Sequence, residues 1–328
     1  MDNRVSRLRT DEQSGPAAPD LRQQWRIQGA SGHPALGSAV TDVPVQGDWS
    51  AWSAPAKLNL FLHITGRRPD GYHNLQTVFQ LLDWGDTVHC RVRGDAAIRR
   101  LGEHSDVTEQ DDLVVRAAHL LKSATGSPGG ADLRVDKRIP VGGGMGGGSS
   151  DAAATLVALN QLWRCGLSLP ALARLGREIG ADVPVFIYGR SAFAEGVGDE
   201  LVPVELPERS YVILDPAAGV STAALFQAPE LTRDSTPLTI AGYLSGSKTE
   251  NVFEPVVRTR YAAVARALDW LSRFGDARLT GTGGVVFLAT DASEAKMIAE
   301  ACPSAMSAWV ARGINVSPLL AQHCDGSG

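Results

Sequence analysis

The chain has few cysteines and no long apolar run, and both absences exclude classes of protein. It holds four cysteines in 328 residues, and none of them forms a Cys-x-x-Cys pair. This spacing disfavours a zinc site, and so few thiols fit a reducing compartment better than a disulfide scaffold. No apolar stretch approaches the roughly 18 residues that a membrane-spanning helix needs. We therefore expect a soluble protein without a membrane partner.

An excess of positive charge is also absent. The chain carries 31 Lys and Arg against 36 Asp and Glu, which gives a net charge of −5. A protein that captures nucleic acid through its charge would have a basic surface, so we expect no nucleic-acid partner. The first 50 residues lack the apolar region of a secretion signal. A cytoplasmic location follows as the expectation.

Length and apolar content predict a folded protein. Apolar residues make up 44% of the chain, and at roughly 150 residues per domain the length corresponds to about two domains. Residues 1–50 are rich in polar residues, Gly and Pro without a hydrophobic period, so we predict a disordered N-terminal extension there. We place a first domain at residues 51–200 and a second, α+β domain at residues 201–323.

Strand and helix patterns follow one another irregularly. Apolar residues occupy every second position from Leu58 to Ile64, which predicts a strand with one apolar face. Further strands are expected at residues 76–82, 87–92, 133–136, 211–214, 278–280, 285–289 and 308–311. Helices are expected at residues 112–122, 149–163, 168–180, 260–274 and 294–301, and an irregular stretch at 216–249. This order favours an α+β fold over a doubly wound sheet.

A run of glycines stands directly before one predicted helix. Six of the seven residues from Gly142 to Gly148 are glycine, and Ser-Ser-Asp follows. Glycine lets the main chain approach a ligand closely, and a helix N-terminus offers free N–H groups with a partial positive charge. The segment is therefore typical of a phosphate-binding loop. It lacks the lysine of a Walker A loop and has too many glycines for a dinucleotide fingerprint.

Two charged residues and one turn each allow two interpretations. Asp182 lies between a predicted helix and an apolar segment. It is either a turn residue that makes local hydrogen bonds or a functional carboxylate with a buried partner. Lys57 lies on the face of its strand opposite the apolar one. It is either an ordinary surface lysine or the partner of Asp182. The glycine-rich turn at residues 280–284 is either a plain hairpin turn or a second anion-binding segment.

Five segments in order resemble the GHMP kinases, a family of small-molecule kinases. They are residues 54–60, 68–73, 140–153, 180–186 and 279–284, and the resemblance spans about residues 52–320. It implies a two-domain α+β fold of the GHMP kinase type with the active site in a cleft between the domains. It also implies ATP and Mg²⁺ as cofactors.

The resemblance assigns roles to particular residues. Lys57 and Asp182 match the catalytic pair. The ATP phosphates would bind Pro140, Val141, Gly142, Gly143, Gly144, Met145, Gly146, Gly147, Gly148, Ser149 and Ser150. Either Ser149 or Ser150 would supply a hydroxyl to the metal. The acceptor substrate would bind Asn59, Tyr72, His73, Phe79, Thr222, Phe226, Thr280, Gly281, Thr282 and Gly283.

Within the family, the aromatic residues point to a pyrimidine-bearing substrate. Tyr72 and Phe226 match a pair that sandwiches a cytosine ring, and His73 would read its edge. The implied reaction is ATP-dependent phosphorylation of the 2-hydroxyl of a cytidine-diphosphate-linked methylerythritol, in the non-mevalonate isoprenoid pathway. Another small alcohol, such as homoserine or a sugar, is the alternative, and a non-catalytic nucleotide-binding protein ranks third. We expect a monomer or a weak homodimer.

Three features depart from the family pattern. Asp112, in Asp111-Asp112-Leu113, stands where an asparagine normally precedes leucine near the adenine pocket, and an ionised carboxylate only accepts hydrogen bonds. Met145 replaces a leucine at similar volume, which we expect to be mild. The extension at residues 1–50 has no counterpart in the family.

Overall fold

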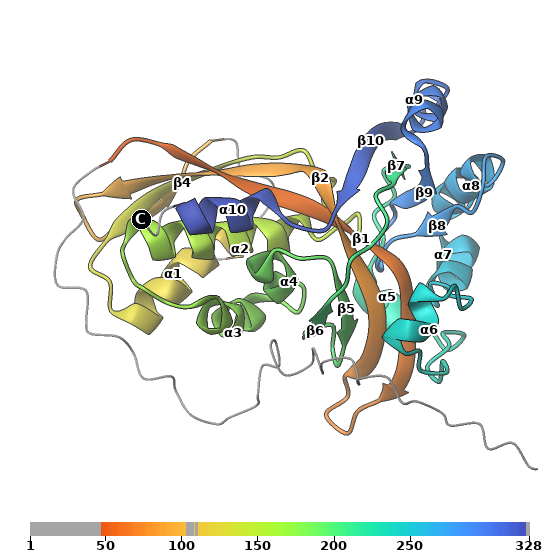
Figure 1. The fold of residues 1–328 in the computed structure, drawn as a ribbon, viewed down its shortest axis with the longest axis horizontal. Coiled ribbons are helices and arrows are strands. Elements are labelled where there is room, and N and C mark those ends of the chain that lie inside the picture. Colours follow the sequence, from red (N-terminus) through yellow and green to blue (C-terminus); the bar gives the residue numbers. More distant parts are fainter. Residues whose placement is uncertain (1–46, 103–107, 109–110, 326–328) are drawn as a thin grey trace, which may run out of the picture.

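Two long antiparallel strands connect the two halves of the molecule (Figure 1). The computed structural model describes residues 47–102, 108 and 111–325, with the main chain alone for 323–325, so most of the predicted extension lies outside the described residues. Strand β1 (Ser50–Arg67) pairs along its length with β2 (His73–Arg93). Both strands run from the helix-covered half on the left of Figure 1 into the half on the right.

The first half packs a layer of helices against one face of a sheet. Its further strands are β3 (Ile98–Arg100), β4 (Gly130–Asp136), β5 (Ala192–Glu195) and β6 (Glu200–Pro203). Its helices are α1 (Leu113–Thr125), α2 (Gly147–Leu162), α3 (Leu169–Ile179), α4 (Val183–Tyr188) and the last helix, α10 (Pro318–Asp325). Helix α2 lies at the centre of this layer, and its small alanines let it pack closely on all sides.

The second half is a smaller sheet with helices on its outer side. Its strand order is β10 (Ser307–Ile314), β7 (Ser210–Asp215), β9 (Val286–Thr290) and β8 (Arg278–Leu279), all antiparallel. Its helices are α5 (Thr222–Phe226), α6 (Ile240–Leu244), α7 (Glu254–Arg260), α8 (Ala262–Leu271) and α9 (Ala292–Glu300). The mixed, largely antiparallel arrangement confirms the α+β class.

The chain returns to the first half at its end. Strand β10 pairs with β2 through Gly313 and Ile314, and Leu319 of α10 belongs to the core of the first half. Leu201, the first residue of the predicted second domain, belongs to that same core. The boundary between residues 200 and 201 therefore stays a prediction, with residues of both predicted domains in one core.

Several elements differ from the sequence-based expectation. The strands predicted at 76–82 and 87–92 are one strand, because Gly85 does not end it but lets β1 approach: a Cβ there would lie 2.2 Å from the Ala54 carbonyl oxygen. The strand around Leu58 has two buried faces, with Lys57 and Asn59 each 3% exposed. The stretch 216–249 contains α5 and α6, and α10 was not predicted.

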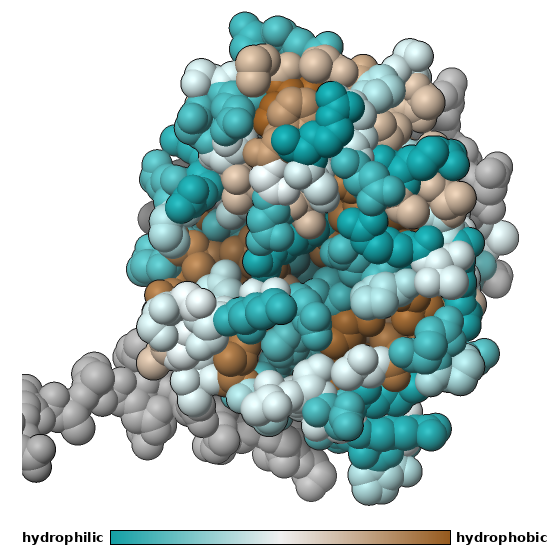
Figure 2. Space-filling model, turned by 90° about the vertical axis from the view of Figure 1, so that its right-hand side faces the viewer, coloured by the Kyte–Doolittle hydropathy of each residue, from teal (hydrophilic) through white to brown (hydrophobic). Residues whose placement is uncertain are grey.

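The surface on the right-hand side of Figure 1 is mostly hydrophilic. Figure 2 shows that its hydrophobic residues form several patches separated by polar ones. None of the described helices is long and apolar enough to cross a membrane.

Candidate active site

A cavity of about 970 Å³ brings together residues from both halves of the chain. It is lined by β1, the first part of β2 and the turn between them, and by the glycine loop, the starts of α1 and α2, the residues before α4, helix α5 and the β8–β9 turn. Of the predicted site residues, all line it except Ser150, Thr280 and Gly283.

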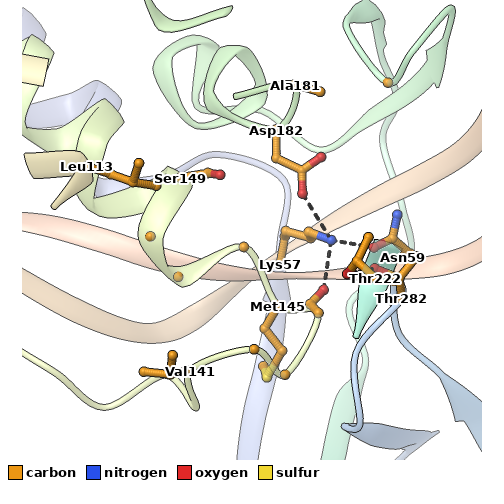
Figure 3. A pocket seen from close by; sticks show the side chains of 18 of the residues that line it. Lys57, Asn59, Leu113, Val141, Met145, Ser149, Ala181, Asp182, Thr222 and Thr282 are labelled. Carbon is orange, nitrogen blue, oxygen red and sulfur yellow. Dashed lines mark hydrogen bonds and ion pairs between the residues drawn. The ribbon is translucent and has the colours of Figure 1, made fainter. Parts of the chain in front are cut away.

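Lys57 lies at the centre of this cavity (Figure 3). An irregularity in the β1–β2 register next to Pro55 precedes it, and its side chain is 3% exposed. Its ammonium Nζ donates to the Gly144 carbonyl at 2.8 Å and to Oδ1 of Asn59, and it lies 5.3 Å from the centre of the Phe79 ring. A buried ammonium needs such partners, because burial without them would favour its neutral form.

Asp182 faces Lys57 from the other side of the cavity. It is the N-cap residue of α4, which has Pro184 in its first turn, and its Oδ2 lies 3.4 Å from Lys57 Nζ. The carboxylate is 32% exposed, and its second oxygen, Oδ1, accepts no hydrogen bond from any described residue. The sequence-predicted pair is therefore together, with one carboxylate oxygen open to the cavity.

The glycine loop ends in a helix start with unused donors. Gly146, with a φ of +74°, is the N-cap of α2, so the helix begins at Gly147, two residues earlier than predicted. Within the described part of the chain, the N–H groups of Gly147, Gly148 and Ser149 donate to no protein acceptor. These donors and the helix dipole make this end of the cavity an anion site.

The β8–β9 turn holds the glycine loop in place through main-chain contact. Gly144 has a φ of +82°, and a Cβ there would lie 2.3 Å from the Thr280 carbonyl oxygen. A Cβ on Gly283 would lie 2.1 Å from the Gly143 carbonyl carbon, while Val285 N donates to the Gly143 carbonyl. Both positions need glycine because two main chains meet there.

The two serines after the loop differ in position. Ser149 lines the cavity, and its hydroxyl has no partner among the described residues. Ser150 is fully buried, and its Oγ donates to the Pro55 carbonyl at 2.7 Å, where it ties α2 to β1. Of the two hydroxyls that the sequence left open, only that of Ser149 faces the cavity.

The remaining polar candidates surround Asn59. Its main-chain N–H donates to Thr280 Oγ1 at 2.9 Å, and its side-chain nitrogen donates to Thr77 Oγ1 at 2.9 Å. Thr280 is fully buried and thus holds β1 rather than lining the cavity. Thr222 and Thr282 line the cavity with their hydroxyl oxygens 2.7 Å apart, next to Asn59 in Figure 3.

The aromatic cluster is arranged differently from the expected sandwich. His73, not Tyr72, stacks on Phe226, with ring centres 5.3 Å apart and an interplanar angle of 24°. Tyr72 belongs to the β1–β2 turn and is 67% exposed at the cavity edge. Phe79 is 2% exposed beneath Lys57, so it serves the core and the cavity together. The sequence could not show which aromatic ring covers Phe226.

The surroundings of His73 favour its neutral form. Burial lowers its pKa, and the nearby positive charges of Arg233 and Arg67 lower it further. Its Nε2 is buried and has no hydrogen-bond partner among the described residues. A neutral imidazole with one unused nitrogen is suited to a polar group on a flat ring.

The departure at Asp112 has a structural explanation. Its Oδ1 accepts from Val114 N at 2.8 Å and caps α1, while its Oδ2 accepts from Arg100 Nε at 3.0 Å. Both oxygens are therefore used within the protein. Met145, the other departure, packs in a core cluster with its side chain pointing away from Lys57.

One charged cluster at the cavity was not predicted. Lys137 Nζ lies 2.5 Å from Asp86 Oδ2 and 2.9 Å from Asp151 Oδ2. Burial raises the pKa of Asp151 to about 7, Lys137 opposes this and Asp86 adds to it. Oδ1 of Asp151 is buried without a partner among the described residues. The acidic residue after the two serines was the available signal.

Comparison with known proteins agrees with this geometry. The family model for the GHMP kinases N-terminal domain matches residues 112–190, and that for the GHMP kinases C-terminal domain matches residues 235–308. The chain is 59% identical over 285 residues to a protein of Xanthomonas axonopodis pv. citri (strain 306) named 4-diphosphocytidyl-2-C-methyl-D-erythritol kinase, covering 86% of this chain and 96% of the relative. A relative of the same name from Xylella fastidiosa (strain 9a5c) is 58% identical, and the match covers 83% of this chain and 92% of the relative.

Solved structures agree as well. A crystal structure of 4-(cytidine 5'-diphospho)-2C-methyl-D-erythritol kinase matches with a TM-score of 0.70 and 31% identity, over 81% of this chain and 99% of the other. Homoserine kinase from Cytophaga hutchinsonii matches with a TM-score of 0.61 and 17% identity over 83% of this chain and 96% of the other, which shows a shared fold. Fold and cavity thus define an ATP-dependent small-molecule kinase. The chain belongs to the GHMP kinase family.

Proposed function

We propose that this kinase transfers the γ-phosphoryl group of ATP to the 2-hydroxyl of 4-diphosphocytidyl-2-C-methyl-D-erythritol, giving the 2-phosphate and ADP. This step belongs to the non-mevalonate route to isoprenoid precursors. The names of the relatives with 58–59% identity support this substrate. The observation that carries the proposal is the Lys57–Asp182 pair, 3.4 Å apart, beside free main-chain donors in one cavity with an aromatic cluster.

Asp182 is proposed to prepare the acceptor alcohol. Its free Oδ1 would accept the hydrogen bond of the 2-hydroxyl, while the Lys57 ammonium lies 3.4 Å from Oδ2 on the other side of the carboxylate. In the transfer, the alcohol oxygen bonds to the γ-phosphorus and the bond to the β–γ bridging oxygen breaks. The hydroxyl proton passes to the carboxylate, and the leaving ADP keeps the electron pair.

The glycine loop, Pro140 to Ser149, is proposed to bind the triphosphate. The unused N–H groups at the start of α2 would donate to its oxygens. Mg²⁺ would bind together with the triphosphate and neutralise charge on its β and γ oxygens. The Ser149 hydroxyl fits such an ion, because Mg²⁺ prefers oxygen ligands and takes its other ligands from substrate phosphates and water. Ser149 offers the hydroxyl that faces this region, whereas the Ser150 hydroxyl is used by Pro55.

The other end of the cavity is proposed to bind the cytidine. The ring would lie at the His73–Phe226 stack, with Tyr72 free to cover its outer face. Thr222, Thr282 and Gly281 line the passage toward Asn59 and would contact the methylerythritol part. Phe79 would contact the substrate beside Lys57. Thr280 and Gly283 would act through the position of the turn, because neither lines the cavity.

The aromatic cluster favours this substrate over the alternative. A small aliphatic alcohol such as homoserine, or a single sugar, has no flat ring to place against the His73–Phe226 stack. We also propose a cytosolic enzyme that is a monomer or a weak homodimer, with domains at residues 51–200 and 201–323.

A product assay tests the proposal. The full chain is incubated with ATP, Mg²⁺ and either 4-diphosphocytidyl-2-C-methyl-D-erythritol, homoserine or galactose, and ADP and the phosphorylated alcohol are measured. We expect a monophosphate product from the cytidylyl alcohol and background ADP from the other two. Faster turnover of homoserine or galactose would overturn the substrate assignment.

A further inference from the structure

Arg67 is a cation at the cytidine end of the cavity without an anionic partner. It lines the cavity, and its guanidinium forms no hydrogen bond or ion pair with any described residue. The neighbouring Arg68 pairs with Asp70 at 3.1 Å and does not line the cavity. An arginine offers five donors and no acceptor, so an unpaired one beside a binding cavity is free to bind an anion.

The other cations that line the cavity have carboxylate partners. Lys57 faces Asp182 at 3.4 Å, Arg100 pairs with Asp112 at 3.0 Å, and Lys137 bridges two carboxylates. Among the described cavity-lining residues, Arg67 is thus the one whose positive charge is not already balanced within the protein. Its charge remains available to a ligand.

Strand register places Arg67 beside the proposed cytidine position. Arg67 is directly opposite His73 in the antiparallel β1–β2 pair, and directly opposite residues place their side chains on the same face of a sheet. His73 stacks on Phe226, and the positive charge of Arg67 reaches His73 strongly enough to lower its pKa. The guanidinium therefore lies on the side of the sheet that faces the aromatic cluster.

The proposed substrate carries two phosphates next to its cytidine. The first of them is joined to the ribose that bears the base, and Arg67 is directly opposite His73, which stacks on Phe226. We propose that Arg67 recognises this cytidylyl phosphate and thereby selects a nucleotide-linked alcohol over an uncharged one. The inference rests on the proposed function, because it assumes that the substrate carries cytidine diphosphate.

Binding measurements with and without phosphate test this role. Cytidine, CMP and CDP are titrated as competitive inhibitors of the wild type, Arg67→Gln, Arg67→Lys and the control Arg68→Gln. We expect Arg67→Gln to weaken CMP and CDP about tenfold, the scale of one charge-assisted hydrogen bond, and to leave cytidine unchanged. Arg67→Lys should recover part of the loss, and Arg68→Gln should match the wild type. The KM for ATP should stay constant in all four.

The outcomes separate this inference from the proposed function. If the wild type phosphorylates the cytidylyl alcohol but Arg67→Gln binds CDP as the wild type does, the role of Arg67 is wrong and the function stands. An equal loss of cytidine and CDP affinity would also overturn it, since that pattern assigns Arg67 to the base or to the fold. Failure of the wild type to use the cytidylyl alcohol would refute the proposed function itself.

Discussion

At the scale of single residues, Phe226 lies at the centre of the aromatic cluster that is proposed to bind the base. It packs between His73 and the edge of Phe253, and Arg233 fixes its main chain by donating to the carbonyls of Phe226 and Ala228 at 2.8 Å. We expect Phe226→Ala to raise the KM for the cytidylyl substrate by the equivalent of about 1–3 kcal/mol, the value of one lost stack.

Tyr72 provides the comparison for this measurement. Because it is 67% exposed and stacks on no ring of the described residues, we expect Tyr72→Ala to raise the same KM less than Phe226→Ala does. Steady-state kinetics with saturating ATP gives both values. A larger rise in KM for Tyr72→Ala than for Phe226→Ala would contradict this expectation and would mean that Tyr72 moves onto the cytosine ring when the substrate binds.

We expect Asp151 to give the site a pH dependence near neutrality. Burial raises its pKa to about 7, so the carboxyl group is largely protonated below pH 7 and ionised above it. Ionisation adds a negative charge in α2 just after its first turn, near the place where the triphosphate is proposed to bind. We therefore expect ATP affinity to fall as the pH rises from 6 to 8.

Asp151→Asn tests this expectation. The substitution removes the titrating group, so the fall in ATP affinity across this pH range should become smaller. Calorimetric titration of the wild type and the variant at three pH values measures it. An equally steep fall in both would assign the pH dependence to another group, such as the nucleotide itself.

Main-chain contact determines the site at the scale of elements. The glycine loop and the β8–β9 turn touch at Gly144 and Gly283, where a Cβ would lie within 2.3 Å of main-chain atoms. We expect Gly283→Ala to separate the two segments and to raise the KM for ATP at least about tenfold, with a lower melting temperature. Gly219→Ala is the matched control, because nothing lies within 4 Å of a Cβ there. Equal ATP kinetics in both variants would contradict the coupling.

Local patterns predicted some elements and missed others for physical reasons. The glycine loop and its helix were predictable because no strand or helix interior favours six glycines in seven positions. The continuity of β2 through Gly85 was not, because it depends on the close approach of Ala54 from another strand. In the same way, the stacking of His73 on Phe226 and the pairing of Lys137 with Asp151 depend on long-range contacts that spacing does not encode.

At the scale of the whole molecule, one cavity contains both proposed anion-binding regions. The proposed triphosphate region lies at the start of α2, the proposed cytidine region lies at the β1–β2 turn, and Lys57 and Asp182 line the same cavity. The site residues all lie between positions 57 and 283. We expect a chain without residues 1–46 to keep its kcat and both KM values, as measured by the ADP assay. A loss of activity would show that this segment contributes to the site.

The Lys57–Asp182 pair is the central claim, and Asp182→Asn tests it most directly. Asparagine keeps the shape of the side chain but removes the charge that faces Lys57 and that is proposed to accept the hydroxyl proton. The measurement is kcat with the cytidylyl alcohol together with the dissociation constant for ATP. We predict that kcat falls by about 10²-fold or more while ATP binds as in the wild type. A variant that turns over at nearly the wild-type rate would contradict the account.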